Sequence, residues 1–122
     1  MKTKELKIGD NVSYKGKAAK IHSLDSPCIY IDVDDGIWGT LEDDANLTPI
    51  PLTEEILEKN GWKVGILKTG RQCYIGGWLY LSQTDEKHWQ FGHGDHCLTA
   101  IKHIHELQHL LWALGIDDDL KI

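Results

Sequence analysis

The sequence predicts an α+β fold: an N-terminal SH3-like small β-barrel, then an antiparallel sheet packed against a short and a long α-helix. The pattern of residues 6–52 predicts short strands separated by turn residues, which is typical of a small barrel. Residues 64–91 repeat this pattern of short strands and tight turns. Residues 99–115 carry apolar side chains at helical spacing, the longest such pattern in the chain.

Composition and turn residues justify the strands of the first half. Residues 28–33, CIYIDV, are rich in the β-branched and aromatic residues that favour strands. Asp35 and Gly36 predict a two-residue hairpin turn, because both central positions of a type I′ turn need positive φ. A strand at residues 47–50 should lie at a sheet edge, since Pro49 cannot donate to a ladder. The expected strands are residues 6–14, 17–24, 28–33, 37–41 and 47–50.

A short helix and a second sheet follow. Thr53 is a good N-cap, Glu54 suits the positive end of the helix dipole and Gly61 supplies a left-handed stop, so the helix should span residues 54–59. Two units result, residues 1–52 and residues 53–122. Each is small, so we expect them to pack together as one compact protein. Further strands are expected at residues 64–67, 72–75, 78–82 and 88–91, before a loop at residues 92–97.

Composition limits the classes of function. The net charge is −6 and the Lys and Arg residues are scattered, which argues against a nucleic-acid partner, because phosphate binding needs clustered cations. The three cysteines have no C-x-x-C spacing, so a reducing compartment is expected. Residues 1–10 contain no apolar signal region, and the longest apolar run is far shorter than a membrane span of about 20 residues. We therefore expect a cytoplasmic protein without a membrane partner.

Residues 105–109, HELQH, match the H-E-x-x-H motif of zinc proteases. In such a site His105 and His109 would bind zinc, and Glu106 would activate the bound water. A third protein ligand is needed, but Trp112 and Gly115 stand where metzincin spacing requires Gly and His. Upstream candidates for that ligand are His93, Asp95, His96 and Cys97.

The helical wheel weighs against the zinc site, because it turns both motif histidines away from the apolar face of the helix. We therefore interpret the motif as structural and expect no catalytic residue, no metal and no cofactor. The alternative is a zinc-dependent hydrolase with Glu106 as its base and His105 and His109 as metal ligands.

Gln108 is the polar residue that least fits its surroundings, since the same wheel places it inside the apolar face. A buried amide without partners costs about 1–3 kcal/mol. We expect Gln108 to bond to the backbone of the adjacent β region and to fix how the helix docks. The functional alternative is that Gln108 lines a ligand pocket.

Aromatic residues offer a second candidate site. Trp78, Tyr80 and Trp89 could stack a nucleotide-like ligand if an aromatic face is exposed, although core packing is the favoured interpretation. Asp95 and Cys97 stand beside His96, but adjacent residues rarely form a nucleophile set. We interpret Asp95 as a helix-entry cap and Cys97 as a small buried residue.

Two stretches resemble a known family. Residues 49–62, PIPLTEEILEKNGW, and residues 104–114, IHELQHLLWAL, are similar to small uncharacterised proteins of phages and prophages of gut Bacteroidota, which have a PLTEE helix and a C-terminal VHELQ-type helix. The resemblance covers most of the chain. Many members have Asn or another residue at the position of His109, which also weighs against a zinc site.

The resemblance and the incomplete catalytic set together favour a non-enzymatic interaction module of phage or prophage origin, acting on a host or phage protein. The alternatives are a small-ligand, nucleotide-like binding protein with an aromatic face and a zinc-dependent hydrolase. The sequence leaves homo-oligomer formation open.

Overall fold

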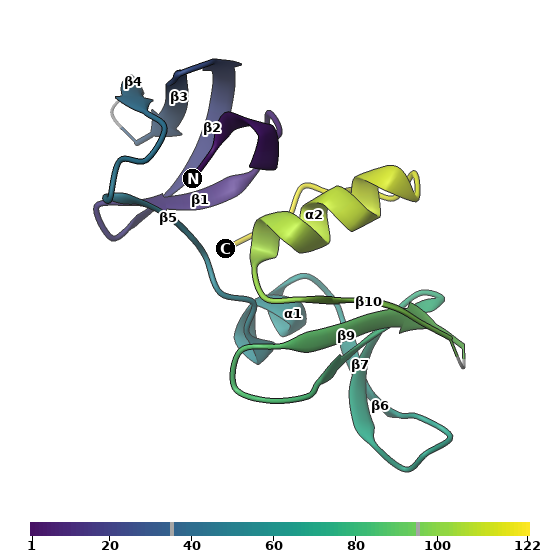
Figure 1. The fold of residues 1–122 in the computed structure, drawn as a ribbon. Coiled ribbons are helices and arrows are strands. Elements are labelled where there is room, and N and C mark those ends of the chain that lie inside the picture. The colour runs from purple at the N-terminus through teal and green to yellow at the C-terminus, as the bar shows by residue number, and fades with distance from the viewer. Residues whose placement is uncertain (35, 95) are drawn as a thin grey trace. The chain divides into compact units, whose positions relative to one another are not determined.

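The computed structural model describes residues 1–34, 36–94 and 96–122 and contains two antiparallel five-stranded sheets and two α-helices (Figure 1). This arrangement confirms the α+β class. Backbone contacts divide the chain into two compact units. The first unit comprises residues 1–50, 103–120 and 122, and the second comprises residues 51–102 and 121.

The first unit contains a five-stranded sheet with the order β4-β3-β2-β1-β5. Four strands lie close to their predicted positions, whereas the strand expected at residues 6–14 spans only Asn11–Tyr14. Within the described residues β4 and β5 are the two outer strands, so the sheet is not closed and the expected barrel is not confirmed. The elements of this unit are the 3₁₀ turn η1 (Thr3–Glu5), β1 (Asn11–Tyr14), β2 (Lys17–Asp25), β3 (Cys28–Val33), β4 (Gly36–Leu41), β5 (Leu47–Pro49) and α2 (Ile104–Ala113).

One face of this sheet forms the apolar core of the first unit. Ile29 and Ile31 alternate along β3 and are fully buried, and Ile31 pairs across the ladder with Ile21. Burial of each such side chain stabilises the fold by about 1.5–3 kcal/mol. Lys15 and Gly16 connect β1 and β2 with φ of 52° and 80°, the positive values that a type I′ turn needs. The buried cluster consists of Leu6, Val12, Ala19, Ile21, Ile29, Ile31 and Leu47.

The second unit begins with the short helix α1 (Glu54–Lys59), which has the bounds predicted from the sequence. Thr53 caps it, with its hydroxyl oxygen accepting from the Ile56 N–H at 3.4 Å. The sheet of this unit has the order β10-β9-β8-β7-β6, and its buried core includes Leu57, Leu81 and Phe91. Its strands are β6 (Lys63–Ile66), β7 (Gln72–Gly76), β8 (Leu79–Gln83), β9 (Trp89–His93) and β10 (His96–Ile101).

The start of the long helix was predicted wrongly. Residues 99–101 belong to β10, which pairs with β9, and α2 begins only at Ile104. Ile101 and Ile104 have helical spacing, but pairing with β9 satisfies the backbone of Ile101 as a strand residue. Cys97 is exposed rather than buried. Asp95, interpreted as a helix cap, and Asp35, expected in a hairpin turn, lie outside the described residues.

The long helix also groups differently from the expected unit of residues 53–122. It belongs with the first unit, because hydrogen bonds from its side chains reach the segment that enters β1. The sheet of the second unit therefore has α1, rather than both helices, within its own unit. No α-helix in the described part of the chain is long and apolar enough to cross a membrane.

Candidate functional site

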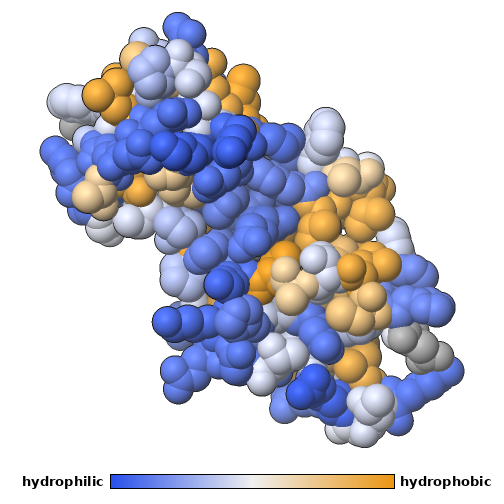
Figure 2. Space-filling view, viewed as in Figure 1, coloured by the Kyte–Doolittle hydropathy of each residue, from blue (hydrophilic) through white to orange (hydrophobic). Residues whose placement is uncertain are grey.

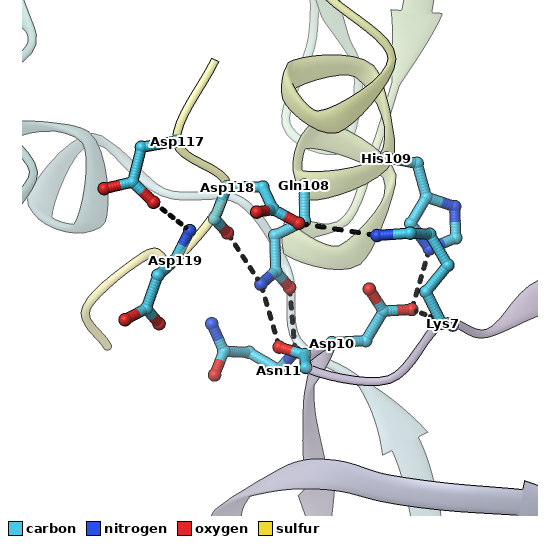
Figure 3. Close-up of polar contacts among 9 residues, drawn as sticks. Lys7, Asp10, Asn11, Gln108, His109, Asp117, Asp118 and Asp119 are labelled. Carbon is cyan, nitrogen blue, oxygen red and sulfur yellow. Dashed lines mark hydrogen bonds and ion pairs between the residues drawn. The ribbon is translucent and has the colours of Figure 1, made fainter. Parts of the chain in front are cut away.

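Gln108 anchors α2 to the first sheet. Its side chain is 1% exposed, and its Oε1 accepts from the Asn11 N–H at 2.8 Å. Its Nε2 donates to the carbonyl oxygens of Gly9 at 3.1 Å and Asp118 at 3.0 Å (Figure 3). The amide therefore bonds to backbone in two segments, the one that enters β1 and the one that follows α2, which confirms the expected bonding of Gln108 to backbone.

His109 has a partner that sequence reasoning missed. Its Nε2 lies 2.7 Å from Oδ2 of Asp10, which is 1% exposed (Figure 3). The same carboxylate oxygen accepts from the Lys7 N–H at 2.8 Å. A buried carboxylate needs such partners, because an unpaired charge is costly in an apolar environment. The only signal in the sequence is the Gly9-Asp10 turn before β1, which does not point to a residue 99 positions away.

His105 was expected on the exposed side of the helix, and the structure corrects this. It is 7% exposed, and its Nδ1 is buried without a hydrogen-bond partner. Burial is the largest influence on its pKa, which is lowered from the ordinary value. The helical wheel failed here because the spacing of apolar residues identifies an apolar stripe and does not show which polar residues beside that stripe are also buried.

Glu106, the candidate catalytic base, caps the N-terminus of α2. Its Oε1 accepts from the His103 N–H at 3.0 Å and lies 3.0 Å from His103 Nδ1. This is the geometry of a capping box, in which the third helical residue satisfies the N-cap backbone. The contact holds the carboxylate at the helix terminus.

The N-cap residue His103 and the helix residues His105 and His109 lie close together. The ring centroids of His103 and His105 are 5.7 Å apart, and those of His105 and His109 are 5.6 Å apart. Within residues 1–34, 36–94 and 96–122, no group of three or more His, Cys, Asp or Glu side chains could hold a metal ion. His93, His96 and Cys97, the upstream candidates for a third ligand, belong to β9 and β10 of the second unit.

The three aromatic candidates do not share one face. Tyr80 pairs with Gly92, whereas Trp89 lies on the face of Leu81 and Phe91 because residues alternate along a strand. Trp89 is 1% exposed and donates from Nε1 to the Leu52 carbonyl oxygen at 3.2 Å. It is therefore a core residue. Trp78, in the turn between β7 and β8, is 55% exposed and contacts the His93 ring edge-on.

Tyr80 borders a cavity of about 410 Å³ inside the second unit. Gln90, Lys68 and Arg71 also line it. A Cβ atom at Gly92 would lie 2.8 Å from the Tyr80 hydroxyl oxygen, so glycine is needed for the ring to take this position. The volume falls in the range of small-molecule sites, about 300–1,000 Å³.

Strand β4 exposes several large apolar side chains on the surface of the first unit. Its register with β3 is continuous from Gly36 to Leu41, and it is an outer strand in the part of the chain that the structure describes. Ile37, Trp38 and Leu41 are 53%, 55% and 58% exposed. In Figure 2, apolar patches interrupt the hydrophilic surface around β4. We call the side of β4 that faces away from β3 the β4 edge.

The ladder geometry identifies the backbone groups at the β4 edge. The Glu42 N–H donates to the Pro27 carbonyl oxygen at 2.8 Å, just beyond the Leu41–Cys28 pair. Hydrogen-bonded and non-bonded pairs alternate in an antiparallel ladder. Counting back from Glu42, the N–H groups of Ile37, Gly39 and Leu41 and the C=O groups of Ile37 and Gly39 point outward. The Leu41 C=O accepts from the Asp44 N–H at 3.2 Å. Sequence analysis predicted the strand but not its place at the edge.

Comparison of the chain with models of known families, with curated proteins and with solved structures finds no significant match.

Proposed function

We propose that this protein is a non-enzymatic binding module whose β4 edge takes up an extended strand of another protein. One observation carries the proposal: β4 is a regular outer strand with three large apolar side chains more than half exposed. An outer strand presents unpaired backbone donors and acceptors, which an extended chain can complete.

The other outer strands carry protection that β4 lacks. Proteins guard sheet edges with proline, charge or bulges. β5 ends at Pro49, β6 begins with Lys63, and the register of β10 shifts between Cys97 and Thr99. The segment GIWGTL of β4 has no proline, no charged residue and no register shift. This contrast supports β4 as the binding surface.

The contacts of α2 support a structural rather than a catalytic role for HELQH. Gln108 and His109 bind the segment that enters β1, and Glu106 caps the helix. We further propose that the first sheet corresponds to an SH3-like barrel that is not closed, in which β5 pairs with β1. Following the resemblance to phage and prophage proteins, we propose a host protein as the partner.

Amide hydrogen exchange tests strand addition directly. The probe is a short capped peptide of alternating valine and threonine without charged residues. In the free protein the outward amides of Ile37, Gly39 and Leu41 should exchange fast. At a peptide concentration of about ten times Kd, their exchange should slow about tenfold. Unchanged exchange at all three amides with every strand-forming peptide would refute the proposal.

Two proline variants provide a matched comparison. Ile37→Pro removes an outward N–H from β4 and should abolish peptide protection. Val64→Pro makes the equivalent change on the outer strand β6, where Val64 is 55% exposed. The Leu67 N–H donates to the Arg71 carbonyl oxygen, and counting back from this bond along the β6–β7 ladder places the Val64 N–H outward. Val64→Pro should bind normally. Ile37→Thr keeps the N–H and should retain weakened binding, which separates binding from folding defects.

A second candidate function is small-ligand binding in the cavity beside Tyr80, favoured by its volume and by the polar groups of Gln90 and Arg71. Adenosine monophosphate is a suitable probe in an NMR titration. Binding should shift the amides that line the cavity and should weaken in Tyr80→Ala but not in Trp78→Ala, since Trp78 does not line it. The absence of shifts at cavity amides would exclude this ligand class.

A further inference from the structure

We infer that the strand taken up at the β4 edge places an aromatic side chain level with Gly39, where that side chain packs against the ring of Tyr30. This inference rests on the function proposed above and names the residue by which the edge selects its partner. It follows from a break in the row of side chains on one face of β4. We call this break, which Gly39 leaves between Ile37 and Leu41, the Gly39 gap.

Gly39 lies inside β4, although the backbone there does not require a glycine. Its φ lies outside the left-handed region, in contrast to that of Gly36 at the start of the strand, which is 130°. The register between β3 and β4 is continuous, so Gly39 does not form a bulge. A glycine inside a strand weakens it and often marks a place where another group approaches closely. The reason for this glycine is therefore to be found in its neighbours.

Tyr30 on β3 is the neighbour that approaches Gly39. The two residues pair across the ladder, and a Cβ atom at Gly39 would lie 3.2 Å from Cε1 of the Tyr30 ring. The ring therefore reaches over Gly39 toward the β4 edge. Ile29 and Ile31 point into the core, so Tyr30 lies on the opposite face of the sheet. A side chain on an added strand would meet this ring directly, because Gly39 places no side chain between them.

The other borders of the Gly39 gap are apolar. Ile37 and Leu41 lie two residues to either side on the same face of β4, and both are more than half exposed. Residues level with each other on neighbouring strands have Cβ atoms about 4.5–5.5 Å apart, and diagonal neighbours remain within reach of aromatic side chains. A side chain level with Gly39 would thus contact Tyr30, Ile37 and Leu41. An aromatic residue fits best, since ring pairs gain energy beyond the area that they bury.

The outward backbone groups centre a partner strand on Gly39. Ile37 and Gly39 each offer an N–H and a C=O group to an added strand. Leu41 offers only its N–H, because its C=O already accepts from the Asp44 N–H. A strand that uses all of these groups runs beside residues 37–41. Its middle residue is then level with Gly39.

The outer strands of the described part of this chain do not supply the aromatic residue. β5, β6 and β10 have the sequences LTP, KVGI and HCLTAI, which contain no Phe, Tyr or Trp. β4 itself carries Trp38, but Trp38 alternates with the outward positions and pairs with the core residue Ile31. The occupant that fits the gap is therefore an extended segment of another protein with an aromatic residue at its centre.

Three capped peptides test the inference. Each has seven residues of alternating valine and threonine, except for a central guest that is phenylalanine, leucine or alanine. In NMR titrations the phenylalanine peptide should bind about threefold more tightly than the leucine peptide and about tenfold more tightly than the alanine peptide. Nuclear Overhauser effects between the guest ring and the Tyr30 ring should establish the register.

Variants separate the guest contact from strand addition. Tyr30→Leu keeps an apolar side chain but removes the ring, so the phenylalanine and leucine peptides should bind equally while the amides of Ile37, Gly39 and Leu41 stay protected. Gly39→Ala keeps the outward N–H but partly fills the gap, and it should also reduce the preference. Trp38→Ala is the matched control, because it removes an exposed aromatic side chain from the other face of β4. It should leave the ratio of the affinities unchanged.

The outcomes are distinguishable. If no peptide protects the β4 amides, the proposed function itself fails and the inference with it. Equal binding of the three peptides, or a phenylalanine preference that persists in Tyr30→Leu, would overturn the inference while leaving strand addition intact. Self-association in sedimentation that is lost in both Ile37→Pro and Val64→Pro would overturn it as well, since β6 of a second copy, which has no aromatic residue, would then occupy the edge.

Discussion

Replacement of Gln108 by leucine tests how α2 is held to the first sheet. Three hydrogen bonds disappear: a buried one that Gln108 accepts from the Asn11 N–H, and two partly buried ones that it donates to carbonyl oxygens. Asn11 is 2% exposed, so its N–H loses its partner without access to water, which costs about 1–3 kcal/mol. Gly9 is exposed and Asp118 partly so; their carbonyls can hydrate, and each lost bond costs about 0.5–1.5 kcal/mol.

We add the costs of the three lost hydrogen bonds and subtract the stabilisation from burying the apolar leucine side chain. The result is a loss of about 2–4 kcal/mol in the free energy of unfolding of Gln108→Leu. Urea denaturation followed by circular dichroism measures it. Gln108→Glu is the informative companion, because it keeps an acceptor for Asn11 but sets a carboxylate against the carbonyl oxygens of Gly9 and Asp118. At neutral pH it should lose more stability than Gln108→Leu. A loss below about 0.5 kcal/mol in Gln108→Leu would refute the docking role.

Three further changes probe packing and titration. Leu107 is fully buried, so Leu107→Ala should lower the free energy of unfolding by about 2–5 kcal/mol, and a loss under about 1 kcal/mol would contradict its core position. Gly92→Ala should destabilise the second unit by about 1–3 kcal/mol or more in urea denaturation, since the new Cβ would clash with the His96 carbonyl oxygen; a neutral result would refute this contact. Burial lowers the pKa of His105, so the unfolded chain binds a proton more readily than the folded protein. The free energy of unfolding is therefore unaffected by this group above the unfolded pKa of about 6.5 and decreases as pH falls from there toward the folded pKa. His105→Leu should flatten the pH dependence of stability below pH of about 6.5, and an unchanged slope would show that His105 does not titrate differently on folding.

The sequence by itself determined the local elements of this protein. Thr53 and Gly61 delimit α1 because a helix cap and a left-handed stop act within a few residues. The strands of the first sheet were predicted near their positions, since turn residues and β-branched runs are local signals as well. The bonding of Gln108 to backbone was also predictable, because a buried amide needs partners wherever it lies.

Only the tertiary structure decided the features that depend on distant neighbours. Residues 99–101 pair with β9 although their spacing also suits a helix, and α2 groups with the first unit rather than with the second. Helical periodicity identifies an apolar stripe but does not reveal that His105 is buried or that His109 contacts Asp10, because both depend on residues outside the helix. The exposure of β4 likewise follows from strand order, which no residue of GIWGTL encodes alone. In each case the deciding partner comes from a segment that the local pattern does not contain.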